Sequence, residues 1–401
     1  MSSQQRDAAI VGIYEYPLRT VGPEASSLRI KAECAIRALE DAGLTLKDVD
    51  ALYEAGEEGA VHAGIPSLPE YLGLHVGIAD TTMAGGASYE FQAAHAKRAI
   101  ASGKANVALL TYGSTLRRGG TALGSSGRSY AAGYPHPVVN MEEPWGLTLV
   151  GDYAMVANRH MHQYGTTSAQ LAEISVAARL HGTRNPQAVQ AMTDLQFKGT
   201  GEITIEEVLN SRVIADPLHM LECCMISDGG GAVVIASPEV ARGCKEKPVW
   251  VLGGGEAIKY PENADDITFS AAARSGPMAF GEAGVSPGEV DVAMLYDSFT
   301  ITVLTVLEDL GFCRKGEGGQ FVQGGRLRFD AEAKPALNTD GGGLSSNHPG
   351  MRGIFLLIEA TRQMRGQSTS QVAGARLAVA SGMGGRLGSR HAAGTIVLGI
   401  D

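Results

Sequence analysis

The sequence predicts an α/β fold made of two copies of one structural unit, and three observations support this prediction. Short apolar segments with the character of buried strands alternate with segments that carry a helical stripe of apolar residues. The residues AGLTLKDVD at positions 42–50 recur as AGVSPGEVD at positions 283–291. Glycine accounts for 53 of the 401 residues, which indicates many tight turns and close backbone contacts.

The first copy is expected to begin with the strand Ala8–Ile13. Ser27–Ala42 carries apolar residues at helical spacing and ends before Gly43, a residue type that commonly terminates helices. The remaining predicted elements are the strand Val49–Tyr53, a helix that follows the turn Gly85-Gly86 and ends near Gly103, the buried strand Ala105–Gly113 and the closing strand Gly231–Ser237.

The second copy repeats this order. Its predicted elements are the strand Pro248–Leu252, the helix Ala271–Ala283, the strand Val290–Leu295, the helix Ile354–Arg365 after a glycine-rich turn, and the strands Ala375–Ser381 and Gly394–Ile400. We therefore divide the chain into an N-terminal half, residues 1–245, and a C-terminal half, residues 246–401. Because strands alternate with helices, we expect a mostly parallel sheet with ligands at the carboxyl ends of its strands. This arrangement would place Gly86 and His348 near one shared cleft.

The two copies differ by an insertion at about residues 114–226. A loop of this length is uncommon unless it forms structure of its own, so we expect the helices Tyr153–Tyr164 and Ser168–Leu180 within it. Residues 117–133 are rich in glycine, serine and arginine, and we interpret them as an irregular lid or substrate loop. Tyr134 and His136 follow this segment and fit a surface loop better than a catalytic site.

The chain is acidic, with a formal net charge of -10. This charge argues against nucleic acid or an anionic membrane as the main partner. The sequence contains no evident secretory signal and no apolar run of the roughly 18 residues that span a bilayer, so we expect a cytoplasmic protein. The five cysteines form no C-x-x-C pair, and the sequence predicts neither a disulfide scaffold nor a metal site.

The turn at Gly85–Ser88 is a candidate for chemistry because a glycine-rich turn opens a helix there. The first amides of a helix have no partner within the helix, and glycine lets a ligand approach them closely. Such a turn is typical of a nucleophile site or of an oxyanion hole. The residues at the turn itself include no cysteine, and Ser88 has no base beside it in the sequence.

Five motifs extend over nearly the whole chain: ALEDAGLTLKDVD near the start, SRVIADPLHMLECCMISDGGGAVV in the middle, YDSFT followed by LEDLGFCRKGEGG, then NTDGGGLSSNHPGMRG and SGMGGRLG. In these motifs the chain resembles the thiolase superfamily, in particular its sterol-carrier-protein-type, thiolase-like branch. The resemblance implies a five-layered αβαβα fold from two halves plus a loop domain, and a homodimer. It also implies a coenzyme A thioester as the substrate, with no other cofactor.

The chain departs from this family at the catalytic cysteines. Thiolases carry a nucleophilic cysteine where the opening helix begins, and the family spacing, counted back from Gly103, puts Gly86 at that position. The second thiolase cysteine falls near Ala380 and Ser381, where no thiol is present. In lacking both thiols, the chain resembles the thiolase-like aldolases of steroid side-chain breakdown. An acyl-enzyme thioester cannot form without a thiol.

Two side chains remain as candidates for catalysis. His348 matches the histidine of the family's G-H-P motif, which donates a hydrogen bond to the thioester oxygen, and Asn347 replaces the glycine of that motif. Tyr296 stands where relatives carry histidine or asparagine, and a phenol can donate to an oxyanion or transfer a proton. Asp297 is expected to orient the turn. The predicted thioester cradle consists of Gly86, Ser88, Gly382 and Gly384, with Ser381 in support.

Three functions are compatible with these residues. The first is a carbon–carbon lyase that cleaves a 3-hydroxyacyl-CoA by a retro-aldol reaction, using His348 for the thioester oxygen and Tyr296 for the hydroxyl proton. The second is an acyl-CoA acyltransferase with an atypical nucleophile such as Ser88 or a repositioned cysteine. The third is a non-catalytic acyl-CoA-binding subunit. The resemblance also implies a separate partner, a small protein with an OB-fold and a zinc ribbon.

Overall fold

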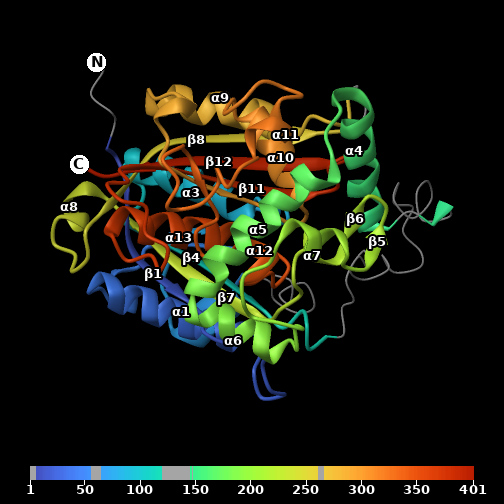
Figure 1. Cartoon of the computed structure of the whole chain (residues 1–401). Helices are drawn as coiled ribbons and strands as arrows, with labels where there is room; N and C mark the ends of the chain where they lie inside the picture. Colours follow the sequence, from blue (N-terminus) through green and yellow to red (C-terminus); the bar gives the residue numbers. More distant parts are fainter. Residues whose placement is uncertain (1–5, 56–64, 120–144, 147, 261–265) are drawn as a thin grey trace.

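The computed structural model describes residues 6–55, 65–119, 145–146, 148–260 and 266–401. Within these residues, ten strands form one sheet in the order β10-β9-β11-β12-β8-β1-β7-β4-β2-β3 (Figure 1). The order is symmetric about its centre, because each half of the chain contributes five strands in the same arrangement. The halves join where β1 pairs with β8, through Ala9 with Trp250 and Ile10 with Val249.

The elements of the first half include all of the predicted ones, with bounds that differ by a few residues, and two that were not predicted, α2 and β3. They are β1 (Ala9–Glu15), α1 (Ser27–Ala42), β2 (Ala51–Glu54), α2 (Ser67–Leu72), β3 (Ile78–Asp80), α3 (Ser88–Ala101), β4 (Val107–Ser114) and β7 (Gly229–Ala236). The bounds of α1 follow from local chemistry. The Ser26 side chain accepts a hydrogen bond from the Arg29 amide at its start, and Gly43 ends it with a φ of 76°.

The second half repeats these elements. They are β8 (Val249–Lys259), α9 (Ala272–Ala283), β9 (Val292–Leu295), α10 (Thr300–Asp309), α11 (Gly318–Phe321), β10 (Ala336–Leu337), α12 (Gly342–Ser345), α13 (Gly353–Arg365), β11 (Leu377–Gly385) and β12 (His391–Gly399). Strand β8 is longer than predicted, because residues 253–255 are glycines that continue it. A Cβ atom on Gly253 or Gly255 would lie under 3.0 Å from backbone oxygens of α9, so these glycines let helix and strand pack closely.

The insertion contains the two predicted helices and further elements. They are α4 (Leu149–Tyr164), α5 (Ser168–Arg184), α6 (Pro186–Asp194), α7 (Ile205–Leu209), β5 (Val213–Ala215) and β6 (Leu218–His219), and α8 (Pro238–Ala241) follows β7. The Thr167 side chain caps α5 by accepting a hydrogen bond from the Gln170 amide, as its sequence indicates. Most of the expected lid, with Tyr134 and His136, lies outside the described residues.

The prediction of a mostly parallel sheet is wrong. In each half, three strands are parallel, with β2 between β3 and β4 and β9 between β10 and β11. All other pairings between neighbouring strands of the described sheet are antiparallel. Only a few residues connect β11 to β12, and so short a connection cannot make the crossover that parallel strands require. The alternation of helix and strand therefore holds for the first part of each half only.

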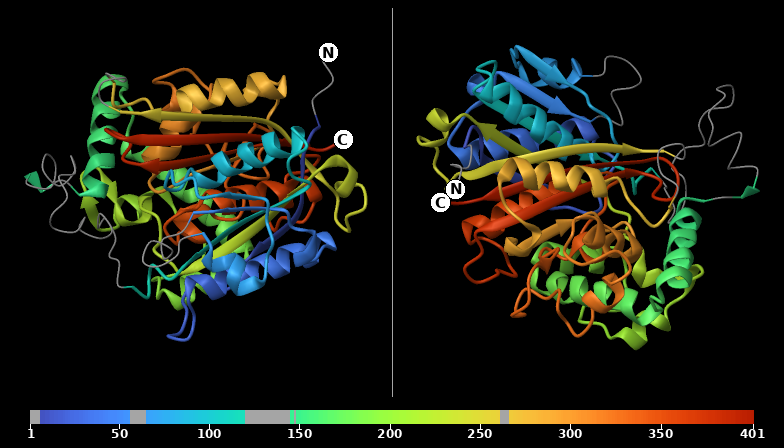
Figure 2. Two further views of the ribbon diagram at one scale, coloured as in Figure 1. Left: turned by 180° about the vertical axis from the view of Figure 1, so that it is seen from behind. Right: turned by 90° about the horizontal axis from the view of Figure 1, so that it is seen from above.

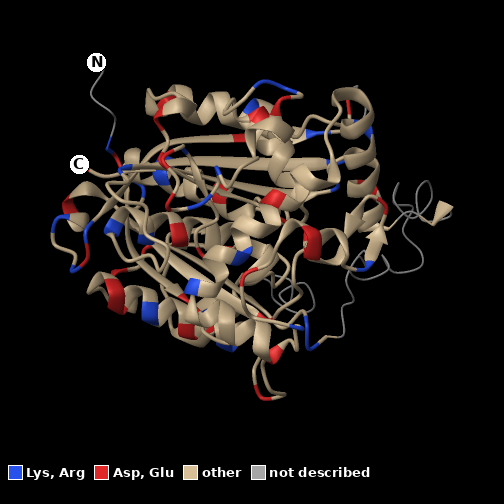
Figure 3. Ribbon diagram, viewed as in Figure 1, with Lys and Arg blue, Asp and Glu red and all other residues tan. Residues whose placement is uncertain are grey.

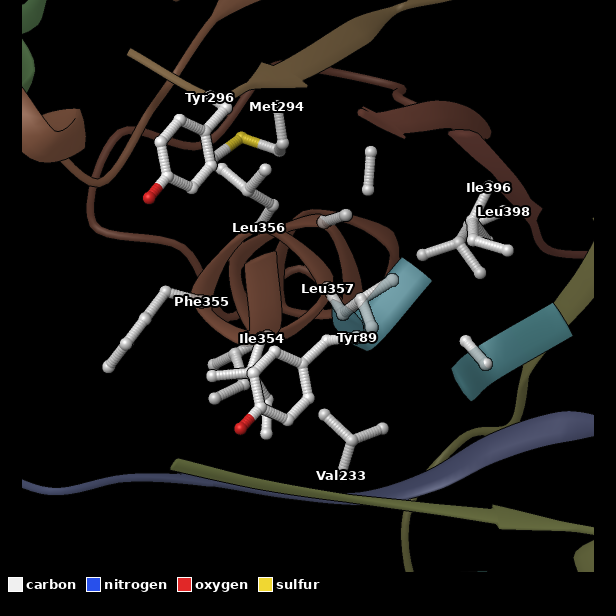
Figure 4. Close-up of a cluster of buried hydrophobic side chains, with 14 of the residues drawn as sticks. Tyr89, Val233, Met294, Tyr296, Ile354, Phe355, Leu356, Leu357, Ile396 and Leu398 are labelled. Atoms are coloured by element: carbon white, nitrogen blue, oxygen red, sulfur yellow. The ribbon is translucent and has the colours of Figure 1, made fainter. Parts of the chain in front are cut away.

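The chain forms five layers. Helices α3 and α13 pack together, and each contacts strands of both halves. Helix α1 covers the outer face of β1, β4 and β7, and α9 covers that of β8 and β12 (Figures 1 and 2). The order is α1, the five strands of the first half, the central helices, the five strands of the second half, and α9, so the two halves of the continuous sheet form separate layers. Figure 4 shows the central layer along α13, with Tyr296 and Met294 on one side and Tyr89 and Val233 on the other.

Charged residues lie mainly on the helices and connections and less on the strands of the sheet (Figure 3). None of the helices in the described ranges is both long and apolar enough to cross a membrane. The layers bring the start of α3, the end of β9, the start of α13 and the end of β11 together. These four element ends carry the predicted site residues.

Candidate active site

The turn before α3 is held by its own serine. The Ser88 hydroxyl donates to the Gly85 carbonyl at 2.7 Å and accepts from the Ala84 amide at 2.9 Å. Gly85 has a φ of 59°, a conformation that favours glycine. Ser88 is fully buried, and its hydroxyl is used within the turn. It can hold the cradle in shape, but it is not presented as a nucleophile.

Gly86 lies directly against Tyr296. A Cβ atom at position 86 would lie under 3.0 Å from Cε2 and Cζ of Tyr296 and also under 3.0 Å from the Met383 carbonyl oxygen. The phenol ring therefore fills the space that a side chain at position 86 would need. Gly384 contacts the same turn, since a Cβ atom there would overlap the Ala84 carbonyl. The structure thus brings the turn before α3 into backbone contact with the glycines at the end of β11.

Tyr296 and His348 face each other. Their ring centroids are 5.4 Å apart and the ring planes are nearly perpendicular, at 82°. The Tyr296 hydroxyl donates to the Gly350 carbonyl at 3.1 Å. Burial raises the pKa of Tyr296 well above its usual value, so the phenol is neutral. The sequence prediction that these two residues act in one site is therefore compatible with their positions.

His348 is a neutral imidazole. Burial, and then the nearby Arg352 guanidinium, lower the pKa of His348 to about 4. Its Nε2 atom is buried and has no hydrogen-bond partner within the part of the chain that the structure describes. Its backbone is fixed, because the His348 amide donates to the Ser227 hydroxyl at 3.0 Å and its carbonyl accepts from the Ser227 amide at 3.3 Å. A free ring nitrogen on a fixed turn can bind a ligand.

Asn347 connects this turn to two buried charges. Its Nδ2 donates to Glu15 at 2.7 Å, and its Oδ1 accepts from Arg352 at 2.6 Å. Arg352 also pairs with Asp340. Arg19 and Arg362 both pair with Glu15 and hold the pKa of that carboxyl at about 2 despite its burial. The side chain of Asn347 therefore acts on the orientation of the His348 turn.

Asp297 and Ser381 support the site through the backbone. Asp297 accepts hydrogen bonds from the amides of Gly343 at 2.8 Å and Leu344 at 3.3 Å, which fixes the start of α12. Burial raises the pKa of Asp297, and the Arg352 guanidinium opposes that shift. The Ser381 carbonyl accepts from the Tyr296 amide at 3.0 Å, while its hydroxyl bonds to Thr395 at 3.1 Å.

Three residues near the site were not among the sequence predictions for it. Glu90 on α3 is buried beside Gly382. Tyr153 on α4 donates to the Gly385 carbonyl at 3.3 Å, so the insertion contacts the end of β11. Cys224 lies near enough to Tyr296 to affect its pKa. Burial raises the pKa of Cys224 well above its usual value, so this thiol is not activated.

The site is suited to stabilising negative charge on an oxygen without forming a covalent bond. A neutral imidazole and a neutral phenol lie together beside the turn before α3, and such donors stabilise an enolate or oxyanion. Among the described residues, no group of three or more histidine, cysteine, aspartate or glutamate side chains is arranged to hold a metal ion. No sequence pattern indicated that Tyr153 and Cys224 lie at this site, because both come from segments far in the sequence from Gly86 and His348.

Comparisons with known families, sequences and solved structures all find related proteins that match nearly the whole chain or its C-terminal half. The family described as "Thiolase C-terminal domain-like" matches residues 253–399. The chain is 35% identical to the 17-hydroxy-3-oxo-4-pregnene-20-carboxyl-CoA lyase of Mycobacterium tuberculosis, covering 92% of this chain and 94% of that protein. It is 30% identical to the acetyl-CoA acetyltransferase of Methanothermobacter thermautotrophicus, covering 96% and 98%. A solved structure, "Ltp2-ChsH2(DUF35) aldolase", superposes with a TM-score of 0.85 at 29% identity, covering 100% of this chain and 99% of that one.

Proposed function

The chain belongs to the thiolase superfamily, and from this premise we propose that it is an acyl-CoA carbon–carbon lyase. Its reaction is the retro-aldol cleavage of a 3-hydroxyacyl-CoA, and a steroid side chain is a candidate acyl group. One observation carries the proposal: Gly86 stands at the nucleophile's position, and the Tyr296 ring fills the space of a side chain there. A site without that nucleophile can stabilise an enolate but cannot form an acyl-enzyme at that position.

The proposed roles follow from the neutral state of both rings. When the bond between carbons 2 and 3 breaks, its electron pair moves into the thioester and forms an enolate. His348 donates from Nε2 to the enolate oxygen, since a neutral imidazole is a suitable donor to such an oxygen. The first amides of α3, which have no partner within the helix, are placed to assist it.

Tyr296 relays the proton of the substrate hydroxyl. The raised pKa disfavours a free phenolate, so the phenol gives up its own proton as it takes the substrate's proton. A proton must also reach carbon 2 of the enolate to complete the product.

An exchange of His348 for alanine tests the proposal. Turnover of 3-hydroxyacyl-CoA esters by His348→Ala should fall about 10²–10³-fold, the usual cost of removing one oxyanion donor. The products are an acyl-CoA shortened by the carbonyl fragment and a free ketone or aldehyde, both measurable by mass spectrometry. Unchanged turnover in His348→Ala would contradict the mechanism.

The acyltransferase function is the alternative, favoured by the similarity to the archaeal acetyl-CoA acetyltransferase. It fits the site less well, because the Ser88 hydroxyl is bonded within its turn and Cys224 is a buried thiol of raised pKa. A stable acyl adduct on intact protein, detected by mass spectrometry after incubation with acyl-CoA, would support the transferase over the lyase. A non-catalytic subunit would bind acyl-CoA without turnover.

We further propose a homodimer that works with a small partner of the DUF35 kind, carrying an OB-fold and a zinc ribbon. The name of the similar structure, "Ltp2-ChsH2(DUF35) aldolase", supports such a partner. Purification of the chain with and without a co-expressed partner tests this. Full activity and stability of the chain alone would contradict the need for one.

A further inference from the structure

Glu90 is a buried carboxyl that the roles given above do not use. It lies in the first turn of α3, one turn after Gly86, and it is fully buried. Both of its carboxyl oxygens lack a hydrogen-bond partner across the residues that the structure describes. Leaving a buried polar group unpaired costs about 1–3 kcal/mol, so such a group calls for an explanation.

Three glycines from three elements make room for this carboxyl. A Cβ atom on Gly382 of β11 would lie 2.9 Å from Oε1 of Glu90 and still closer to Oε2. A Cβ atom on Gly353 of α13 would lie 2.5 Å from Oε2, and one on Gly394 of β12 would lie 2.6 Å from the Cβ of Glu90. The same Cβ on Gly353 would also touch the Gly86 carbonyl oxygen. The carboxyl therefore borders the turn at Gly86 and the glycines at the end of β11, and no side chain at Gly353 or Gly382 separates it from them.

Among the residues that the structure describes, no countercharge fixes the carboxyl as an anion. The charged side chains on the helices packed around it are engaged elsewhere: His95 with Asp80 and Glu256, Lys97 with Glu282, Arg98 with Glu256, Arg352 with Asp340, Glu359 with Thr339 and Ser368, Arg362 with Glu15, and Arg365 with Asp41. His391, at the start of β12, is neutral, because burial lowers its pKa to about 3. Burial raises the pKa of Glu90 well above its usual value, so the group is a neutral acid.

The reaction requires a group of this kind. Cleavage leaves an enolate whose carbon 2 needs a proton, while His348 donates to the enolate oxygen and Tyr296 handles the hydroxyl proton. A glutamine would fill the same space without the risk of ionisation, so the property that distinguishes glutamate here is a transferable proton. We propose that Glu90 stores the proton that carbon 2 of the enolate takes up, directly or through one water molecule.

The proton balance closes, and this inference rests on the proposed lyase function. The proton transfers occur together as the carbon–carbon bond breaks. The substrate hydroxyl gives its proton to Tyr296, the proton of Tyr296 passes to Glu90, and the Glu90 O–H bond breaks as a C–H bond forms at carbon 2. The pair from the broken carbon–carbon bond ends in the new C–H bond, and both residues return to their initial states.

Hydrogen exchange at carbon 2 of the product distinguishes the role of Glu90 from that of Tyr296. In D2O, at a pH that ionises part of Glu90, the enzyme and the product acyl-CoA alone should exchange the protons on carbon 2. The Glu90 carboxylate then removes such a proton while His348 holds the enolate oxygen, and the Tyr296 relay is not needed. We expect Glu90→Gln to lose at least about 10²-fold of this exchange. Tyr296→Phe should keep the exchange and lose cleavage. Glu54→Gln, a buried carboxyl paired with Lys31 at 3.1 Å, is the matched control and should exchange as the unmodified enzyme does.

The outcomes are distinct. Retention of exchange in folded Glu90→Gln, or its loss in Tyr296→Phe, would overturn the role of Glu90. Absence of both cleavage and exchange in the unmodified enzyme, with its partner present, would instead overturn the lyase function. Glu90→Asp keeps an acid but shortens the side chain, and partial exchange in this variant would support the proton role over one of packing. Melting temperatures of all variants confirm that they fold.

Discussion

Exchange of Gly86 for alanine tests the packing on which the proposed chemistry depends. The distance from the added Cβ to the nearest ring atom of Tyr296 would be more than 1 Å below the 3.4 Å of an ordinary contact. The alanine cannot move away from the ring, because the Met383 carbonyl oxygen lies on another side. Overpacking of a filled site costs about 1–3 kcal/mol. Because one obstacle is backbone, we expect a loss of about 3 kcal/mol in the free energy of unfolding.

The effect on turnover should be larger than the effect on stability. The ring of Tyr296 must move by about 1 Å, and a misplacement of that size in a catalytic group costs about 10²-fold in rate. Denaturant unfolding measures the first quantity, and release of ketone or aldehyde from a 3-hydroxyacyl-CoA measures the second.

Gly281→Ala is the matched control. Gly281 lies in α9, and a Cβ atom there would meet nothing within 4 Å. Alanine in a helix interior is favoured over glycine by about 0.5–1 kcal/mol, so this variant should be equally or slightly more stable. If Gly86→Ala unfolds and turns over like the Gly281→Ala control, then Tyr296 does not fill the space at position 86, and the steric argument is wrong.

Three other predictions concern the neighbours of Gly86. Tyr296→Phe loses the hydrogen bond to the Gly350 carbonyl, so we expect a loss of about 1 kcal/mol in the free energy of unfolding. Its rate of cleavage should fall by at least about 10²-fold, and turnover equal to that of the unmodified enzyme would exclude the relay. Asn347→Ala removes one hydrogen bond from Glu15 and one from Arg352, although both keep their ion pairs. Denaturant unfolding should show a loss of about 2–3 kcal/mol, whereas a neutral result would mean that water replaces the amide. His348 has a folded-state pKa of about 4, below the ordinary 6.5, so the unfolded chain binds its proton more tightly and stability is lost as the pH falls from about 6.5 to about 4. The part of the loss due to His348 amounts to about 3 kcal/mol. His181 and His391 also have lowered pKa values and keep their own parts, so unfolding curves at several pH values should show a smaller loss in His348→Gln by about this amount.

Much of the fold is readable from the sequence because its signals are local. The bounds of α1 follow from Ser26 and Gly43, and the repeat at residues 42–50 and 283–291 reflects two turns of the same construction. The direction of β7 and β12 is not readable in this way. Strand direction depends on which neighbour a strand pairs with, and apolar character alone says nothing about that.

The site is only partly readable for a related reason. Gly86 and His348 lie in turns with a recognisable pattern, whereas Tyr153 and Cys224 approach from remote segments. Glu90 illustrates the limit most clearly. An acidic residue in the first turn of a helix is the ordinary complement to the helix dipole at an exposed surface, so its sequence position gave no reason to expect burial. Only the glycines of three other elements, far away in the sequence, reveal that it lies inside.

The absence of a cysteine at position 86 and the presence of a tyrosine at position 296 have the same steric cause. A nucleophile at position 86 and a phenol at position 296 compete for the same volume, so the site accommodates one or the other. The nucleophiles left nearby are unsuitable, since Ser88 is bonded within its turn and Cys224 is a buried thiol. What remains is a set of neutral donors around a turn, with a protonated Glu90 behind it. Such a set favours a reaction that makes and quenches an enolate, and this is why the lyase accounts for the geometry better than the transferase does.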